Sequence, residues 1–472
     1  MPLSSGRRMW YDSPRMGNRY LKKTFSDKDF LRQSASIAVP VMLQLVLSTV
    51  TNMVDTMMIG SLGTATISAV GLANKFFFVF SLLVFGVHSG TGLLMAQFFG
   101  NSDSFHIRKT FGLGMIINLT AAFLFLGVAL ANPAFVLHLF TDSAESTAIG
   151  IRYLRVVCFC YPLFGLTSLM SSMLRSTRQV KVPVRAAAVS ICVNVCLNYT
   201  LIFGHFGLPA MGVEGAAVAT VIARFAECAI LIYYSFFQGE TLKGKFSDFF
   251  GWTRGFLRNF ADHSLPVICN EMTWGLGTTL YFVAYGHIGD AAVAAITISS
   301  TVTDIVTTAG NGLSSAASVI LGNELGAGHL EKADDYGKKL LVVGALAGLC
   351  LGALMLPLRG AILQLFNVPD SVRADAARCM GIYFCILPVI YENLIIIVGV
   401  LRAGGDTRMC FLIDVSGVWL LAAPLAFLGA LLWHLPIYMI YGMVLMEEVF
   451  KCTMGFLRYR KKKWLRNLAV EV

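Results

Sequence analysis

The sequence predicts an all-α polytopic membrane protein, with twelve transmembrane helices in two parallel six-helix repeats around a central cleft. Three features of the chain predict this fold: an apolar composition, twelve apolar stretches of spanning length and an internal duplication. Of the 472 residues, 56% are hydrophobic and 14% are charged, whereas about a quarter of the residues in a soluble domain are charged. The excess of apolar side chains is therefore expected to face lipid.

The apolar stretches are each about 20 residues long, the length that a helix needs to cross the hydrocarbon core. Helices are expected rather than open strands, because strand edges would leave backbone groups without hydrogen-bond partners in lipid. The spans are predicted at residues 37–59, 67–99, 110–131, 148–174, 186–205, 213–237, 262–285, 291–321, 338–358, 379–400, 411–431 and 435–456.

Basic residues orient the spans, because cytoplasmic loops collect Lys and Arg. With the N-terminus inside, 30 of the 37 Lys and Arg fall on the cytoplasmic side, six lie at or near the outside, and Arg224 lies within the sixth span. Both termini are therefore predicted in the cytoplasm. The net charge of +10 reflects this topology, and nucleic-acid binding is not expected.

The two halves of the chain repeat each other in order along their length. The matching pairs include Pro40 with Pro266, Gly63 with Gly289 and, with one residue of slip, Arg175 with Arg402. We call the separation between Pro40 and Pro266 the repeat offset. Each repeat holds six spans, an even number, so both halves insert the same way up as parallel bundles. The predicted organisation is a basic cytoplasmic segment at 1–36, an N-lobe at 37–237, a cytoplasmic linker at 238–260, a C-lobe at 261–457 and a basic cytoplasmic tail at 458–472.

Four polar side chains fall in the outer half of the N-lobe. Asp55 lies near the outer end of the first span, Asn194 and Asn198 share one face of the fifth, and Thr220 lies in the sixth. A carboxylate, two amide oxygens and a hydroxyl are hard ligands that suit Na⁺ or a proton, so we predict a cation site here. The alternative is that Asp55 is a buried polar group satisfied by the amides. Pro40 removes a backbone hydrogen bond from the first span and is a candidate hinge.

Three acids lie near mid-depth in the C-lobe: Glu271, Asp304 and Glu392. A carboxylate within a span is costly and is functional by default, with structural ion pairing as the alternative. Acids that face a cleft would attract organic cations, so a substrate-binding role is expected for these three.

Other charges in the spans have simpler explanations. Arg224 and Glu227 are three residues apart on one helix, which predicts a local ion pair. Asp414, Glu447 and Glu448 lie near the cytoplasmic ends of their spans, where water is expected to reach them. The eight histidines form no cluster with carboxylates inside a span, which argues against a membrane-embedded metal enzyme.

Four motifs are specific enough to compare with a family. VDTMMIGSLGTATISAVGLA, from Val54, runs from the first span into the second, and LRAGGDTR, at 401–408, follows the tenth. NVCLNYTLIFG and GVEGAAVAT stand at 194–204 and 212–220. Together they resemble signatures of prokaryotic multidrug and toxic compound extrusion (MATE) transporters, over about residues 30–455. The resemblance implies export of cationic, amphipathic compounds against inward Na⁺ or H⁺ across a bacterial inner membrane.

The resemblance also implies roles for individual residues. The family's N-lobe cation site falls on Asp55, Asn194, Asn198 and Thr220, and several branches have aspartate at position 198. Glu271 resembles the seventh-span glutamate of other branches, whose tenth-span acid falls on Tyr391, one residue before Glu392. The implied partners are membrane lipid and small organic cations, the implied cofactors are none beyond the coupling ion, and a monomer is expected to function.

Two other functions compete with cation export. A lipid-linked precursor flippase of the same superfamily would need cationic side chains in the cleft to hold pyrophosphate, and the spans offer acids and Arg224 alone. A receptor or scaffold without transport would leave the duplication and the intramembrane acids unexplained.

Overall fold

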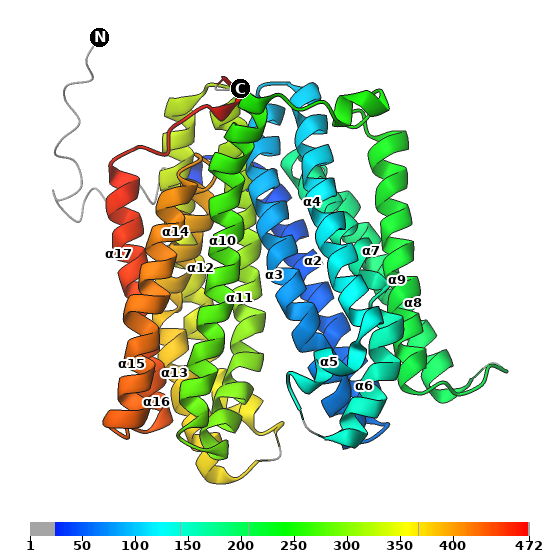
Figure 1. The fold of residues 1–472 in the computed structure, drawn as a ribbon. Helices are drawn as coiled ribbons and strands as arrows, with labels where there is room; N and C mark the ends of the chain where they lie inside the picture. The colour runs from blue at the N-terminus through cyan, green and yellow to red at the C-terminus, as the bar shows by residue number, and fades with distance from the viewer. Residues whose placement is uncertain (1–23, 142, 206, 367, 471–472) are drawn as a thin grey trace.

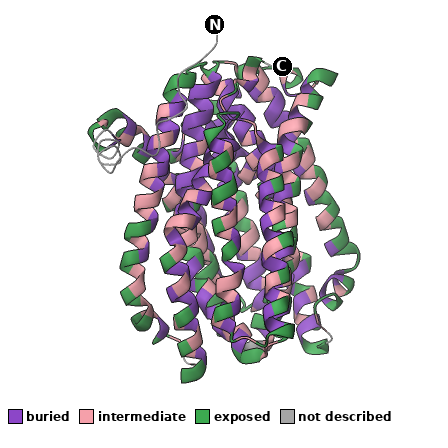
Figure 2. Cartoon of the chain, turned by 90° about the vertical axis from the view of Figure 1, so that its left-hand side faces the viewer, coloured by how far each residue is buried: buried purple, intermediate pink, exposed green. Residues whose placement is uncertain are grey.

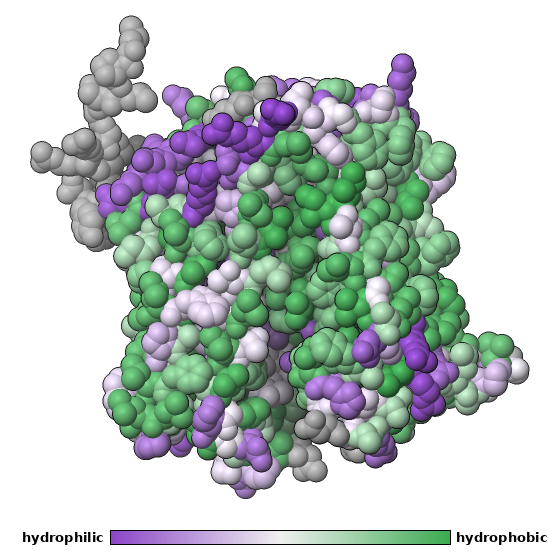
Figure 3. Space-filling view, in the orientation of Figure 1, coloured by the Kyte–Doolittle hydropathy of each residue, from purple (hydrophilic) through white to green (hydrophobic). Residues whose placement is uncertain are grey.

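Two helical bundles stand side by side, and the first and last described residues, 24 and 470, lie at the same end of the molecule (Figure 1). The computed structural model describes residues 24–141, 143–205, 207–366 and 368–470, and no strand occurs within these ranges. Figure 2 shows buried residues along the interior of the bundles and exposed or half-buried residues on their outer sides. Figure 3 shows hydrophobic residues over the middle of one face, with hydrophilic residues gathered toward its two ends.

The N-lobe contains the first six spans. These are α2 (Lys28–Gly60), α3 (Thr64–Gly100), α4 (Ser104–Ala131), the bent pair α6 (Ala144–Val157) and α7 (Cys160–Ser176), α8 (Lys181–Phe203), and α9 (Val213–Ile232) with the π-helix η1 (Tyr233–Gln238). The short α5 (Pro133–His138) precedes the bent pair, whose two helices meet at 51°.

The C-lobe contains the other six spans. These are α10 (Arg254–Gly286), α11 (Asp290–Gly326), α12 (Leu330–Leu363), α13 (Asp370–Asn393) with η3 (Leu394–Leu401), the run α14 (Thr407–Val415), η4 (Ser416–Ala422), α15 (Ala423–Phe427) and η5 (Leu428–Leu432), and α16 (Ile437–Val444) with α17 (Met446–Arg460). Short 3-10 helices lie in the linker, η2 (Phe246–Phe249), and in the tail, η6 (Leu468–Val470).

The predicted twelve-span fold is confirmed. Among the described residues, nine helices are long and apolar enough to cross a membrane, and the α6–α7 pair makes a tenth. The other two predicted spans are α10 and the α16–α17 pair, which carry several charged residues along their length. The N-terminal segment predicted at 1–36 contains the start of α2 at Lys28, while residues 1–23 lie outside the described part of the chain.

The duplication appears in space as paired contacts between the lobes. A Cβ on Gly86 of α3 would lie 2.6 Å from the Cα of Ile268 in α10. A Cβ on Gly312 of α11 would lie 2.9 Å from the Cα of Met42 in α2. The repeat offset takes Gly86 to Gly312 and Met42 to Ile268, so equivalent glycines let the first two helices of each repeat approach the other lobe closely.

The end of the molecule that carries the termini is closed by a seam between the lobes. A Cβ on Gly100 would collide with the carbonyl oxygen of Asn323, and one on Gly326 would collide with that of Gln97. The side chain of Gln97 donates to the carbonyl of Ala403 at 2.6 Å, and that of Asn323 donates to the carbonyl of Ser176 at 3.1 Å. These bonds cross between the lobes in both directions.

Both ends of the described chain reinforce this seam. Asp27 caps α2 by accepting from the backbone N–H of Phe30, and it accepts from Lys339 of α12 at 2.5 Å. That hydrogen bond lowers the pKa of Asp27. In the tail, Trp464 and Leu468 are fully buried, and the N–H of Leu468 donates to Oε1 of Gln97 at 2.6 Å. The C-terminal segment therefore bridges the C-lobe and the N-lobe.

Candidate functional site

A carboxylate and two amides meet inside the N-lobe. Nδ2 of Asn198 donates to Oδ1 of Asp55 at 2.5 Å and to Oδ1 of Asn194 at 3.2 Å. Asn194 and Asn198 are one turn apart on α8 and are 3% and 0% exposed, while Asp55 on α2 is half-buried. The Oδ1 of Asn198 is buried without a hydrogen-bond partner, so an oxygen acceptor is available beside the carboxylate.

Thr220, the fourth residue predicted for this site, is not bonded to the other three. Its hydroxyl donates to the carbonyl of Ala216 at 2.9 Å, one turn back on α9. Arg224 lies one turn further along α9 and interacts electrostatically with Asp55. The guanidinium of Arg224 donates to Glu227 at 2.8 Å, which confirms the predicted local ion pair.

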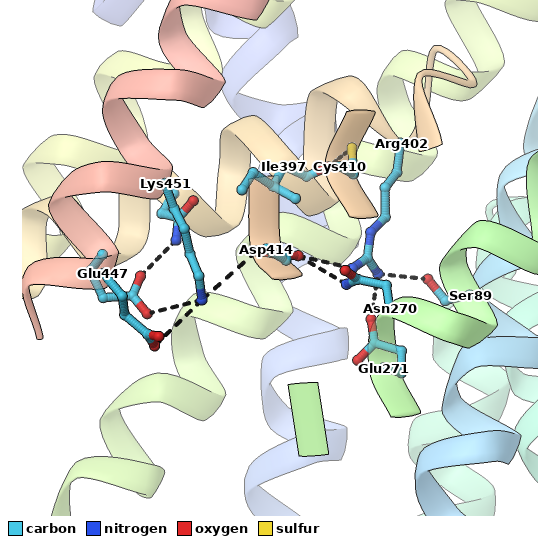
Figure 4. Close-up of polar contacts among 11 residues, drawn as sticks. Ser89, Asn270, Glu271, Ile397, Arg402, Cys410, Asp414, Glu447 and Lys451 are labelled. Atoms are coloured by element: carbon cyan, nitrogen blue, oxygen red, sulfur yellow. Dashed lines mark hydrogen bonds and ion pairs between the residues drawn. The ribbon is translucent and has the colours of Figure 1, made fainter. Parts of the chain in front are cut away.

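In the C-lobe, Glu271 of α10 is held by a base. Its carboxylate lies 2.7 Å from Nη1 of Arg402, and the two residues are 8% and 3% exposed (Figure 4). The distribution of basic residues predicts Arg402 on the cytoplasmic side and Arg224 as the one base within a span; this prediction is wrong for Arg402, which is buried beside Glu271. The same Nη1 lies 3.4 Å from Oγ of Ser89 on α3, so the pair also reaches the N-lobe.

The LRAGGDTR motif forms the turn that carries Arg402. Gly405 has a φ of +76°, which favours glycine, and its N–H donates to the carbonyl of Arg402 at 2.8 Å. Asp406 then accepts from Nε and Nη2 of Arg458 at 2.5 and 2.9 Å. The turn is thereby fixed against α17, and the Arg402 side chain points back into the lobe rather than into water.

The buried charges continue from Arg402 to α17. Asp414 lies 3.9 Å from Arg402 and 3.8 Å from Nζ of Lys451, which lies 3.4 Å from Glu447 (Figure 4). We expected water to reach Asp414, Glu447 and Glu448, but Asp414 and Glu447 are only 9% and 5% exposed. The expectation was wrong because α14 and α17 pack their charged faces against α10 and α13. The four-residue spacing of Glu447 and Lys451 on one helix is the sequence feature that could have predicted their ion pair.

The other predicted substrate residues are not joined to Glu271. Tyr391 is buried, and its hydroxyl donates to the carbonyl of Val306 at 2.8 Å. Glu392 is half-buried beside the backbone of Ala345 in α12, and Asp304 on α11 is exposed. Within the described ranges, neither Glu392 nor Asp304 forms an ion pair with a base.

A duplicated bundle of twelve membrane helices with carboxylates buried inside each lobe defines a polytopic membrane transporter. The family model MatE matches residues 40–200 and 266–428, and the chain belongs to the MATE family. The two matched segments begin at 40 and 266, a separation equal to the repeat offset, in agreement with the duplication.

Relatives and solved structures agree with this assignment. The chain is 25% identical over 443 residues to a probable multidrug resistance protein NorM of Thermotoga maritima, covering 92% of this chain and 93% of the relative. It is 26% identical over 413 residues to the probable multidrug resistance protein YoeA of Bacillus subtilis, covering 84% and 86%. A structure described as MATE in the straight conformation superposes with a TM-score of 0.83 at 17% identity, covering 91% and 95%. A transporter of the MOP superfamily from Pyrococcus furiosus, described as having a binding pocket of reverse polarity, gives the same values.

Proposed function

We propose that this protein is a secondary active antiporter, which exports cationic amphipathic drugs or toxic metabolites in exchange for Na⁺ or H⁺. The single observation that carries the proposal is the N-lobe carboxylate Asp55, which accepts from the buried amide of Asn198, itself bonded to Asn194. An acid inside a span is functional by default. The names of the bacterial relatives, probable multidrug resistance proteins, support this substrate class.

The N-lobe site suits a small cation chemically. A Na⁺ ion would be held by the Asp55 carboxylate and the amide oxygens of Asn194 and Asn198, while a proton would bind to the carboxylate itself. Of these ligands, the amide oxygen of Asn198 is buried without a hydrogen-bond partner, so it is available to the ion. Thr220 could still offer its hydroxyl oxygen to the ion, because a hydroxyl that donates to the carbonyl of Ala216 keeps its lone pairs.

Alternating access would follow from the closure at one end. The seam between the lobes closes the end that carries the termini, whereas Figure 3 shows the surface hollowed between the lobes at the other end. With the chain in the inner membrane and both termini in the cytoplasm, this state would be open to the outside. Pro40, which lies inside α2, is the proposed hinge for the return movement. Both lobes belong to one chain, so a monomer would contain everything that this transport cycle needs.

Organic cations would meet two unpaired acids in the C-lobe. Asp304 and Glu392 are exposed and half-buried, and no base neutralises them in the described structure. Glu271 instead forms an ion pair with Arg402, and the Tyr391 hydroxyl donates to the carbonyl of Val306. We therefore propose Asp304 and Glu392 as the substrate-binding acids, with Glu271 and Tyr391 bound to protein partners in this conformation.

A lipid-linked precursor flippase would need free cationic side chains in the cleft. The buried bases Arg402 and Lys451 give this alternative little support. Arg402 lies against Glu271 and Lys451 lies against Glu447, so neither offers a free cation to a pyrophosphate group. Membership of a transporter family disfavours a receptor or scaffold.

The test is uptake of a fluorescent organic cation into proteoliposomes, driven separately by a Na⁺ gradient and a pH gradient. One of the two gradients should drive uptake in the parent, and Asp55→Asn should abolish it at equal protein content. Glu145→Gln is the matched control, because Glu145 is exposed on α6. Uptake that neither gradient changes, or that survives Asp55→Asn, would contradict the proposal.

A further inference from the structure

Three carboxylates of the C-lobe surround one ammonium group. Nζ of Lys451 lies 3.4 Å from Glu447, 3.8 Å from Asp414 and 3.9 Å from Glu448. We call Asp414, Glu447 and Glu448 the Lys451 triad. Their side chains are 13%, 7% and 18% exposed, and that of Lys451 is 3% exposed. If all four groups were ionised, the cluster would carry two uncompensated negative charges away from water, which is strongly unfavourable.

Charges on the surrounding elements do not remove this excess. Arg402 approaches Asp414 at 3.9 Å but is paired with Glu271 at 2.7 Å. The remaining titratable groups that face the triad are neutral phenols and thiols or a further acid: Tyr281 and Tyr285 of α10, Tyr383 of α13, Cys410 of α14, Cys452 of α17, and Glu392, which faces Cys452.

Two buried amides beside the triad lack a donor. Asn393 of α13 donates from Nδ2 to Glu448 at 2.6 Å, and Asn270 of α10 donates from Nδ2 to Asp414 at 2.9 Å. These asparagines are 7% and 3% exposed, and the Oδ1 atom of each is buried without a partner. A protonated carboxyl group supplies an O–H donor, and a proton on Glu448 would provide one to the oxygen of Asn393 beside it.

The triad also stands where the internal duplication places the N-lobe site. The repeat offset takes Asp55 to Tyr281, and the Tyr281 hydroxyl donates to Glu447 at 2.6 Å. The later part of each repeat is displaced by one further position, as Arg175 and Arg402 show. With that displacement the equivalent pairs are Thr220 with Glu447 and Arg224 with Lys451.

We propose that the Lys451 triad is a second, separate proton-binding site, in the C-lobe, and that the proton resides on Glu448. Lys451 already occupies the position between the carboxylates that a metal ion would need, so a proton reduces the excess from two negative charges to one. Glu448 takes it because its oxygen is the farthest of the three from Nζ, at 3.9 Å, and so gains least from the ammonium charge. Asp414 stays ionised between Lys451, Arg402 and Asn270.

Infrared difference spectroscopy of the full-length protein in lipid nanodiscs tests the proposal without any substrate. Spectra are compared between mildly alkaline and mildly acidic buffer, and the carbonyl stretch of protonated carboxyl groups is followed. The Asp55→Asn variant, which lacks the N-lobe acid, should retain such a band, and Asp55→Asn/Glu448→Gln should lose it. Glu145→Gln, at an exposed acid, should change nothing.

A second variant keeps the acid in place. Asn393→Leu removes both the N–H that donates to the ionised Glu448 and the oxygen that would accept from its protonated form, so the band should persist with a shifted pH dependence. The proposal is overturned if Asp55→Asn alone removes the band, or if neither Glu448→Gln nor Asn393→Leu alters it. The infrared experiment measures no transport. Its outcome is therefore independent of whether the protein exports cations in proteoliposomes.

Discussion

The seam between the lobes has no room for one added methyl group at Gly326. A Cβ there would collide with the carbonyl oxygen of Gln97, a backbone atom that cannot rotate away. Gly326→Ala should therefore force the lobes apart at this end. Overpacking of this kind costs about 1–3 kcal/mol, and here the cost falls only on the state in which the seam is closed. Since about 1.4 kcal/mol is a factor of ten, the ratio of closed to open molecules should fall roughly 5- to 150-fold.

The change in helix propensity from glycine to alanine does not complicate this comparison. It acts on α11 in both states and therefore cancels from their ratio. A matched control is Gly71→Ala in α3, because no atom lies within 4 Å of a Cβ built at Gly71. Gly100→Ala, on the other side of the same seam, should reproduce the effect from the N-lobe.

Electron-electron distance measurements provide the assay. Spin labels at Ser104→Cys and Glu331→Cys, two exposed positions at the terminal end of the lobes, are introduced after the native cysteines have been replaced. Gly326→Ala should transfer population to a longer distance, and Gly71→Ala should match the parent. If Gly326→Ala leaves the distance distribution unchanged, the seam is not the closed gate of a transport cycle.

Three other contacts can be tested by substitution or deletion. Asn198→Asp places a second carboxylate beside Asp55, where two charges about 4 Å apart repel by about 4 kcal/mol at an effective dielectric constant of about 20. The efflux rate should then depend more steeply on pH than in the parent or in Asn194→Ala. Superimposable pH profiles of the three proteins would contradict this. Arg402→Met should lower the free energy of unfolding by about 3–5 kcal/mol, since it leaves Glu271 buried without its base. Thermal unfolding measures this loss of stability. Adding Glu271→Gln to Arg402→Met should recover much of it. Deletion of residues 464–472 removes the bond from Leu468 to Gln97, so the spin-label distance should lengthen; an unchanged distance would show that the tail does not hold the seam.

The number and order of the spans could be predicted because each depends on local sequence. An apolar run of spanning length has to be helical in lipid whatever surrounds it, and the repeat offset fixes the relation between the lobes. The proximity of Asp55, Asn194 and Asn198 followed from depth and helical face. The hydrogen bond of Thr220 to its own helix could not be predicted, because a hydroxyl chooses between partners by rotation about a single bond.

The C-lobe network was missed for two physical reasons. Counting bases by their distance from a span end treats Arg402 as solvated, but the turn at Gly405 directs its side chain back into the lobe. The C-lobe spans also contain the π-helical segments η3, η4 and η5, whose hydrogen bonds reach one residue further than those of an α-helix. Each such segment changes which side chains share a face, so the contacts of Asp414 with Arg402 and Lys451 cannot be predicted from regular helical spacing.

The two lobes descend from one repeat, yet their interiors have diverged in charge. At equivalent positions on the first helix of each repeat, the N-lobe has Asp55 bonded to a neutral amide, and the C-lobe has Tyr281 bonded to Glu447. Asp55 would gain or lose one cation beside the amide of Asn198 and within the field of Arg224. An acid beside Lys451 changes the balance of a network that extends through Arg402 to Ser89 of the N-lobe. A cation bound in the N-lobe and a proton bound in the C-lobe would therefore act on the lobe interface differently, so the two sites need not titrate together.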